Sequence, residues 1–247
     1  MESAIVFLTT LIAAILSSMS GGGTGMIVYP VFLSLGMPLP LVVATSLVNS
    51  TFWVLPASYN YLKGRVVDWK FIIFFSGIGL VGSYLAFLLV ISLEQRIFEI
   101  IVGTIIVSLA AYTYLRKELG LFEKRTYPQW RQALAYPFAL LQGFYENAFG
   151  AGNGIAFTLL THYTKGFDFI DALGHYYAIA FPWCLFGAFL LIQQGYYDLN
   201  IMMFSVIGSL AGAYVGSKYA KCKGNKFIKT LFVTIGGILG LKLLLGF

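Results

Sequence analysis

The sequence predicts an all-α integral membrane protein that crosses the bilayer several times. Of its 247 residues, 59% are hydrophobic and only 11% are charged, whereas a soluble domain carries about 25% charged residues. A chain with so few charges cannot cover a folded domain of 27.2 kDa with polar surface, and a bilayer removes that requirement. The 22 Phe and 16 Tyr residues agree with this prediction, because aromatic rings are enriched at lipid–water interfaces.

The apolar stretches predict the membrane helices, each of which needs about 20 residues to cross. The stretches are residues 4–19, 40–62, 71–92, 97–115, 132–149, 168–192, 199–217 and 227–246. Two shorter apolar segments, 24–36 and 153–164, each follow a glycine-rich turn. These segments could be short crossings, could form hairpins with the preceding helix, or could be surface loops that leave eight plain crossings.

The distribution of Lys and Arg favours the first two options. If the short segments cross or form hairpins, fourteen of the 16 basic residues fall on one side of the membrane, and only Arg96 and Lys242 fall on the other. With eight plain crossings the division is nine to seven. Because cytoplasmic loops carry an excess of basic residues, we expect ten segments, cytoplasmic basic loops and both termini outside.

Three other features limit the function. The N-terminus lacks the positive region and small-residue cleavage site of a signal peptide, so residues 4–19 are predicted to be the first helix. Cys184 and Cys222 lie in unrelated contexts and indicate neither a disulfide nor a metal site, and no cofactor is expected. The net charge of +6 agrees with basic cytoplasmic loops, and no basic stripe with interleaved aromatic residues indicates a nucleic-acid partner.

The second half of the sequence repeats the first at an offset of about 130 residues. The glycine-rich turn 21–25 corresponds to 150–154, and Gly82-Ser83-Tyr84-Leu85-Ala86 corresponds to Gly212-Ala213-Tyr214-Val215-Gly216. Asp68 corresponds to Asp198, and Arg96 to Lys226. Apolar sequences align easily by chance, so an independent test of the repeat is needed.

Loop charge supplies that test. The loop 63–70 has three basic residues and its counterpart 193–200 has none. The loop at Arg96 has one basic residue and its counterpart 218–226 has four. Opposite bias in equivalent loops is what two repeats of inverted topology require. We therefore expect a first transmembrane repeat over 1–115, a charged cytoplasmic linker over 116–131 and a second repeat over 132–247.

Transporters with inverted repeats bind solutes near the bilayer midplane, where short or broken helices meet. The two glycine-rich turns are the predicted location, because the amide groups and positive dipole ends of two short helices could there face one anion. The alternative is that the glycines only permit close helix packing. Candidate residues that bind the substrate are Gly22, Gly23, Thr24, Gly25, Thr45, Ser46, Asn49, Gly152, Asn153, Gly154 and His175.

Glu146 is the acidic residue that lies within an apolar stretch, about four residues before the second turn. Ionisable groups at membrane depth are costly and usually functional. Glu146 is therefore the candidate proton carrier, or a hydrogen-bond donor to the substrate. The alternative is a structural carboxyl that binds free amides of the adjoining turn.

At these residues the chain resembles the sulfite exporter TauE/SafE family. The resemblance rests on Gly21-Gly22-Gly23-Thr24-Gly25 with Pro30, Gly36 and Ala44-Thr45-Ser46, and on Gly143-Phe144-Tyr145-Glu146 leading into Gly150-x-Gly152-x-Gly154 and Gly174-His175. It implies secondary transport of sulfite, sulfoacetate or other organosulfonates. The chain departs from the family pattern near Leu159, where a proline is expected, and at Asn153, which replaces a glycine.

These observations predict a plasma-membrane transporter that exports a small anion, with or without proton coupling, and that acts on its substrate without catalysis. Its partners would be the anion and the lipid bilayer. The sequence is also compatible with a homo-oligomer. One alternative is a carrier of another small solute or a metal cation. A second alternative is an intramembrane hydrolase using Ser46 and His175, which occupy adjacent places when the two repeats are aligned.

Overall fold

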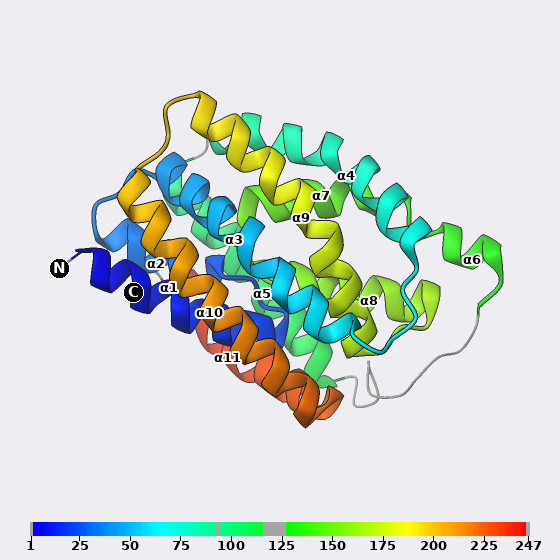
Figure 1. Cartoon of the computed structure of the whole chain (residues 1–247). Coiled ribbons are helices and arrows are strands. Elements are labelled where there is room, and N and C mark those ends of the chain that lie inside the picture. Colours follow the sequence, from blue (N-terminus) through cyan, green and yellow to red (C-terminus); the bar gives the residue numbers. More distant parts are fainter. Residues whose placement is uncertain (1, 92–93, 116–126, 246–247) are drawn as a thin grey trace.

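The computed structural model describes residues 2–91, 94–115 and 127–245, and in these residues every regular element is a helix (Figure 1). The first half contains α1 to α5, with the bounds Glu2–Ser20, Gly25–Ser34, Leu39–Leu62, Trp69–Val90 and Gln95–Leu115. The second half contains α6 to α11, with the bounds Gln129–Ala133, Pro137–Phe149, Asn153–Lys165, Phe169–Gln193, Leu199–Lys223 and Asn225–Leu245. The predicted linker 116–131 lies mostly outside the described residues, apart from its last five.

The protein is a multi-pass membrane protein of the all-α class. In the described residues, five helices are long and apolar enough to cross a bilayer, namely α1, α3, α4, α9 and α10. They agree with five of the predicted stretches to within a few residues. The predicted stretch 132–149 differs, because its helix α7 begins only at Pro137. Proline has no backbone N–H to donate and therefore favours the first turn of a helix.

The short helices α2 and α8 begin inside the bundle. At 1.5 Å per residue, the 10 residues of α2 and the 13 of α8 extend about 15 and 20 Å, well below the hydrocarbon thickness of about 30 Å. Thr24, directly before α2, lies 3.4 Å from Ser50 in the middle of α3. These two helices are therefore too short to cross on their own.

The helices of the two halves are intercalated. α1 packs along α10, α7 packs along α4, α3 packs against α9, and α5 packs against α11. α3 and α9 run in opposite directions, since Leu62 lies beside Gly174 at one end and Leu47 lies beside Gly187 at the other. Arg96 donates to the carbonyl of Leu244 at 2.9 Å, which joins the start of α5 to the end of α11.

Glycines on α10 let α1 approach closely. A Cβ atom at Gly208 would lie 2.5 Å from the Phe7 carbonyl oxygen, and Cβ atoms at Gly212 and Gly216 would meet the carbonyls of Leu11 and Ile15. The spacing of four residues places all three glycines on one face of α10. Small residues at such positions allow helix backbones to pack in lipid, where hydrophobic burial gives little driving force.

Candidate functional site

The two glycine-rich turns meet in the interior of the bundle. The Gly25 amide donates to the Gly150 carbonyl at 3.2 Å, and the Gly152 amide donates to the Gly22 carbonyl. Each turn therefore gives one donor and one acceptor to the other. Since all backbone groups at membrane depth need partners, this pairing stabilises two irregular segments that could not face lipid.

Glycine is required in these turns for two separate reasons. Gly23 and Gly152 have φ angles of +76° and +78°, in the left-handed region that residues with a Cβ atom seldom adopt. A Cβ atom on Gly23 would also overlap the Gly150 carbonyl oxygen, and one on Gly154 would lie 2.6 Å from the Gly21 carbonyl oxygen. The glycines thus permit contact between the turns, and the Gly25 and Gly152 amides are engaged in that contact.

Thr24 belongs to a cluster of buried neutral polar groups. Its Oγ1 lies 3.4 Å from Asn49 Oδ1 and 3.4 Å from Ser50 Oγ. Asn49 Nδ2 donates to Ser205 Oγ at 3.1 Å, and Trp53 Nε1 donates to Ser50 Oγ at 3.2 Å. The cluster joins the start of α2 to α3 and α10, and all its side chains are buried. None of these hydroxyl, amide and indole groups carries a formal charge, and they are hydrogen-bonded to one another.

Glu146 lies at the centre of a second buried cluster. Its Oε2 accepts hydrogen bonds from Asn153 Nδ2, at 2.8 Å, and from the Tyr176 hydroxyl. Its Oε1 is 3.6 Å from the thiol of Cys184. The amide, the phenol and the thiol all act as donors here, so a carboxylate at this position has its oxygens well satisfied.

The two clusters occupy corresponding positions beside the paired turns. Thr24 and Asn153 are equivalent in the sequence repeat, and each reaches from the start of its short helix to polar side chains of its own half. The first cluster is neutral, whereas the second is acidic. The junction of the turns therefore has a neutral polar cluster on one side and a buried carboxyl on the other.

The remaining predicted residues have different surroundings. Thr45 is fully buried, and its Oγ1 has no hydrogen-bond partner among the residues that the structure describes. Ser46 is buried next to Thr45 on α3, and the hydroxyl of Tyr29 on α2 lies against the turn at Gly150. His175 lies at one end of the bundle, where Nε2 accepts from the Asp68 amide at 3.0 Å and Nδ1 is 2.7 Å from the Asp171 carbonyl.

This position of His175 gives it a defined tautomer. Because Nε2 accepts a hydrogen bond, Nδ1 carries the proton and donates to the Asp171 carbonyl. The ring also packs on Phe167, with centroids 4.6 Å apart. Both hydrogen bonds of the His175 ring that the structure gives therefore go to backbone groups. No cluster of three or more His, Cys, Asp or Glu side chains that could hold a metal occurs in the described parts of the chain.

Sequence reasoning missed five side chains in these clusters: Ser50, Trp53, Tyr176, Cys184 and Ser205. Tyr176 could have been found, because it occupies the position equivalent to Ser46 in the repeat. Ser50 follows Asn49 directly, but adjacent residues on a helix point in different directions. Nothing in the sequence connects Ser205 with Asn49, since 156 residues separate them.

Comparison with known proteins decides the family. The family model described as sulfite exporter TauE/SafE matches residues 6–243. The chain belongs to the sulfite exporter TauE/SafE family. It is 28% identical to "Probable membrane transporter protein ORF9" of Sinorhizobium sp, over 98% of this chain and 92% of the relative.

Two further relatives give the same description. This TauE/SafE protein is 29% identical to a "Probable membrane transporter protein" of Haemophilus influenzae, over 97% of the chain and 93% of the relative. It is 25% identical to "Probable membrane transporter protein YfcA" of Escherichia coli, over 97% of the chain and 88% of the relative. No solved structure matches the chain. The TauE/SafE protein is therefore a membrane transporter.

Proposed function

We propose that this TauE/SafE protein is a secondary transporter of small anions, with sulfite or an organosulfonate as substrate and export across the plasma membrane as the favoured direction. The observation that carries the proposal is the junction of the two glycine-rich turns, which is flanked by the neutral Thr24–Asn49 cluster and the acidic Glu146 cluster. The family description, which names a sulfite exporter, supports the choice of anion.

The architecture of two inverted repeats, 1–115 and 132–247 joined by the linker 116–131, belongs to the same proposal. It is supported by the antiparallel packing of the equivalent helices α3 and α9 and by the paired contacts of α1 with α10 and of α7 with α4. An inverted repeat can expose one central site alternately to the two membrane faces. The junction of the turns is a central site of this kind.

Lys63, Lys165 and Lys221 lie at one end of the bundle. Lys221 Nζ donates to the Lys63 carbonyl at 2.6 Å, and Lys165 Nζ is 2.7 Å from Asp68 Oδ2 in the same loop as Lys63. Eight plain crossings would put the loop 63–68 on the side opposite to Lys165 and Lys221. We assign this basic end to the cytoplasm under the positive-inside rule, which leaves both termini outside.

Export of an anion from a cell that is negative inside is downhill by about 2.3 kcal/mol per charge per 100 mV. Proton coupling is therefore needed only for movement in the opposite direction or against a gradient. Glu146 is the proposed proton carrier, because its carboxyl is buried and its donors, Asn153 and Tyr176, lie on two helices that flank the junction.

The test is flux in proteoliposomes loaded with sulfite, and then with small sulfonates, under imposed voltage and pH gradients. We expect voltage-driven flux of at least one of these anions, and Glu146→Gln to abolish its pH dependence. Glu94→Gln, which changes an exposed carboxyl in the loop before α5, is the matched control and should behave as wild type. Absence of flux for every sulfur anion, in folded protein, would remove the substrate assignment.

A further inference from the structure

Arg65 connects the two halves through an ion pair with two buried carboxylates. It lies in the loop between α3 and α4, and its Nη1 is 3.1 Å from Asp168 Oδ2 and 3.2 Å from Asp171 Oδ1. The Asp168 and Asp171 side chains are only 1% and 4% exposed, whereas that of Arg65 is 24% exposed. Two carboxylates this deeply buried need a cation, because desolvation of an unpaired charge is costly.

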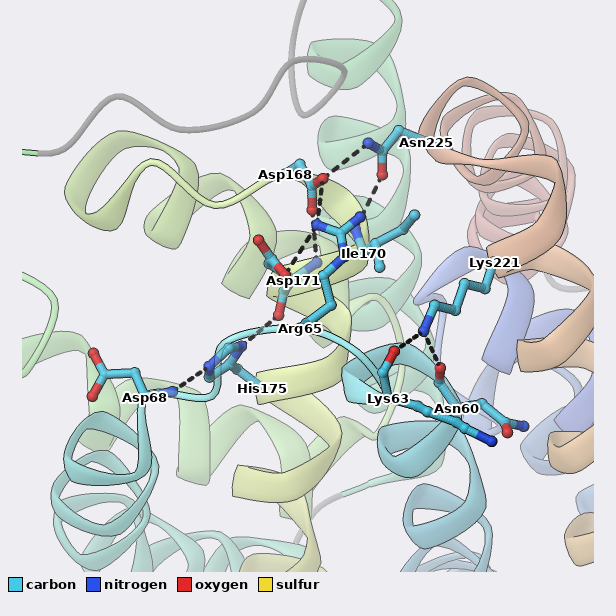
Figure 2. Close-up of polar contacts among 10 residues, drawn as sticks. All are labelled: Asn60, Lys63, Arg65, Asp68, Asp168, Ile170, Asp171, His175, Lys221 and Asn225. Atoms are coloured by element: carbon cyan, nitrogen blue, oxygen red, sulfur yellow. Dashed lines mark hydrogen bonds and ion pairs between the residues drawn. The ribbon is translucent and has the colours of Figure 1, made fainter.

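Further contacts fix the same loop to the second half (Figure 2). Within the second half, Asn225, the first residue of α11, donates to the Asp168 Oδ2 that Arg65 contacts, at 3.2 Å. Lys221, in the last turn of α10, donates to the carbonyls of Asn60 and Lys63 at 2.7 and 2.6 Å. Lys165, which ends α8, pairs with Asp68. We call Arg65, Asp68, Lys165, Asp168, Asp171, Lys221 and Asn225 the interhalf lock.

The lock is adjacent to the candidate site through α9. Asp171 is in the first turn of α9, and His175, one turn later, binds the Asp68 amide through Nε2. The next residue, Tyr176, donates to Glu146. Displacement of the start of α9 relative to the loop 63–68 would therefore move a residue that contacts the Glu146 carboxyl.

At the opposite end of the bundle, the counterparts of the Arg65 ion pair are uncharged. In the repeat offset of 130 residues, Arg65 corresponds to Gly195, Asp168 to Pro38 and Asp171 to Leu41. None of these three counterparts carries a charge. The ion pair of Arg65 with Asp168 and Asp171 therefore has no charged counterpart at the equivalent positions of the other face.

We propose that the interhalf lock is a gate that closes one face of the transporter. Arg65 separates from Asp168 and Asp171 when that face opens, whereas the counterparts of these three residues at the opposite face carry no charge. The asymmetry favours the conformation that is closed at the locked face. Arg65 thereby sets the equilibrium between this conformation and the one that is open at the locked face. The gate rests on the transporter class and on the inverted repeat, and it does not depend on which solute is carried.

Cys184 provides a native reporter for this gate. It is fully buried and lies beside Glu146, so a reagent reaches it only through an open face. The exposed Cys222 is removed by Cys222→Ser. A membrane-impermeant methanethiosulfonate is then added to sealed vesicles of each orientation, and the rate of Cys184 modification is measured from each face.

The gate predicts that Arg65→Gln speeds modification from the locked face by about tenfold or more, since it leaves two buried carboxylates without their cation. Modification from the opposite face should stay equal or become slower. Arg65→Lys keeps the charge and should remain close to wild type. Lys63→Ala is the matched control in the same loop, because the lock uses the Lys63 carbonyl and not its side chain.

Three results would overturn the gate. They are an unchanged rate in Arg65→Gln, an equal increase from both faces, which indicates general loosening, and a rate in Arg65→Lys as fast as in Arg65→Gln. The labelling requires no solute. Faster one-sided modification of Cys184 in a protein that carries no sulfite would therefore uphold the gate and reject sulfite as the substrate. Flux of sulfite together with an unchanged modification rate in Arg65→Gln would support the substrate and reject the gate.

Discussion

Asp68 and Asp198 cap the N-termini of α4 and α10 in the same way. In each case Oδ1 accepts a hydrogen bond of 3.0 Å from the backbone amide three residues later, Phe71 in one helix and Ile201 in the other. The residues are 130 positions apart, and one repeat offset relates them. The same capping hydrogen bond therefore recurs at two positions that the sequence repeat makes equivalent.

Removal of these two caps should have unequal effects. Asp198→Ala is expected to lower the free energy of unfolding by about 1 kcal/mol, which is typical for loss of an N-cap side chain. Asp68→Ala should cost more, because it also removes the contact with Lys165. Thermal unfolding in detergent measures both. Equal losses would show that the contact with Lys165 contributes nothing measurable.

The pH dependence of the Asp68 contribution follows from its surroundings. Burial raises the pKa of Asp68, but hydrogen bonds from Lys165 and the Phe71 amide, with the Lys165 charge, outweigh it and hold the pKa below its ordinary value of 3.8. A lowered pKa means that the stabilisation is complete above 3.8 and is lost as the pH falls through the folded-state value. The difference in melting temperature between wild type and Asp68→Asn should therefore stay constant from pH 8 to pH 5. A difference that shrinks within that range would contradict the assignment.

The glycine-rich turns allow a test with a matched control. Gly23 and Gly36 have similar φ angles, +76° and +80°, but a Cβ atom at Gly36 meets nothing within 4 Å, whereas one at Gly23 overlaps the Gly150 carbonyl. Gly36→Ala should cost about 1–2 kcal/mol of backbone strain alone. Gly23→Ala should cost clearly more and should reduce the yield of folded, monodisperse protein. Similar behaviour of the two variants would mean that the contact between the turns is not needed for folding.

The sequence was sufficient to predict most of the helical elements, because most apolar runs are long and are bounded by charges, prolines or glycines, but it did not predict the short helix α6 or the start of α7 at Pro137. It also located the two turns, whereas the role of Glu146 stays a prediction. It could not predict that Gly25 and Gly152 bind the opposite turn, since both packing and ligand binding select glycine. His175 was expected to bind substrate, a prediction that stays untested; its observed partners, the Asp68 amide and the Asp171 carbonyl, are backbone groups that no side-chain pattern reveals.

The glycine face of α10 should be essential for its packing on α1. Gly212→Leu would place a large side chain against the Leu11 carbonyl and Ala14, and overpacking typically costs about 1–3 kcal/mol or more. Gly77→Leu is the control, because no atom lies within 4 Å of a Cβ atom there. Thermal unfolding should separate the variants, with Gly212→Leu unfolding at lower temperature. A fully stable Gly212→Leu protein would show that α1 can move away without loss.

Tyr176 is the most direct test of the acidic cluster. Tyr176→Phe keeps the ring, which packs on Phe157 with centroids 5.6 Å apart, but removes the hydroxyl that donates to Glu146. A hydrogen bond to a charged group contributes about 1.5–3 kcal/mol, so flux should fall by about tenfold or more if proton transfer at Glu146 limits transport.

The neighbouring variant Tyr177→Phe is the control for Tyr176→Phe. It removes a hydroxyl that donates to the Ser17 carbonyl at 3.1 Å, on the first-half side of α9 and away from the carboxyl. Both variants lose one buried hydroxyl from the same helix, so a general loss of stability should affect them alike. A change in the pH profile of flux in Tyr176→Phe alone would place the proton at Glu146. Unchanged profiles in both would leave Glu146 as a structural carboxyl that joins α7, α8 and α9.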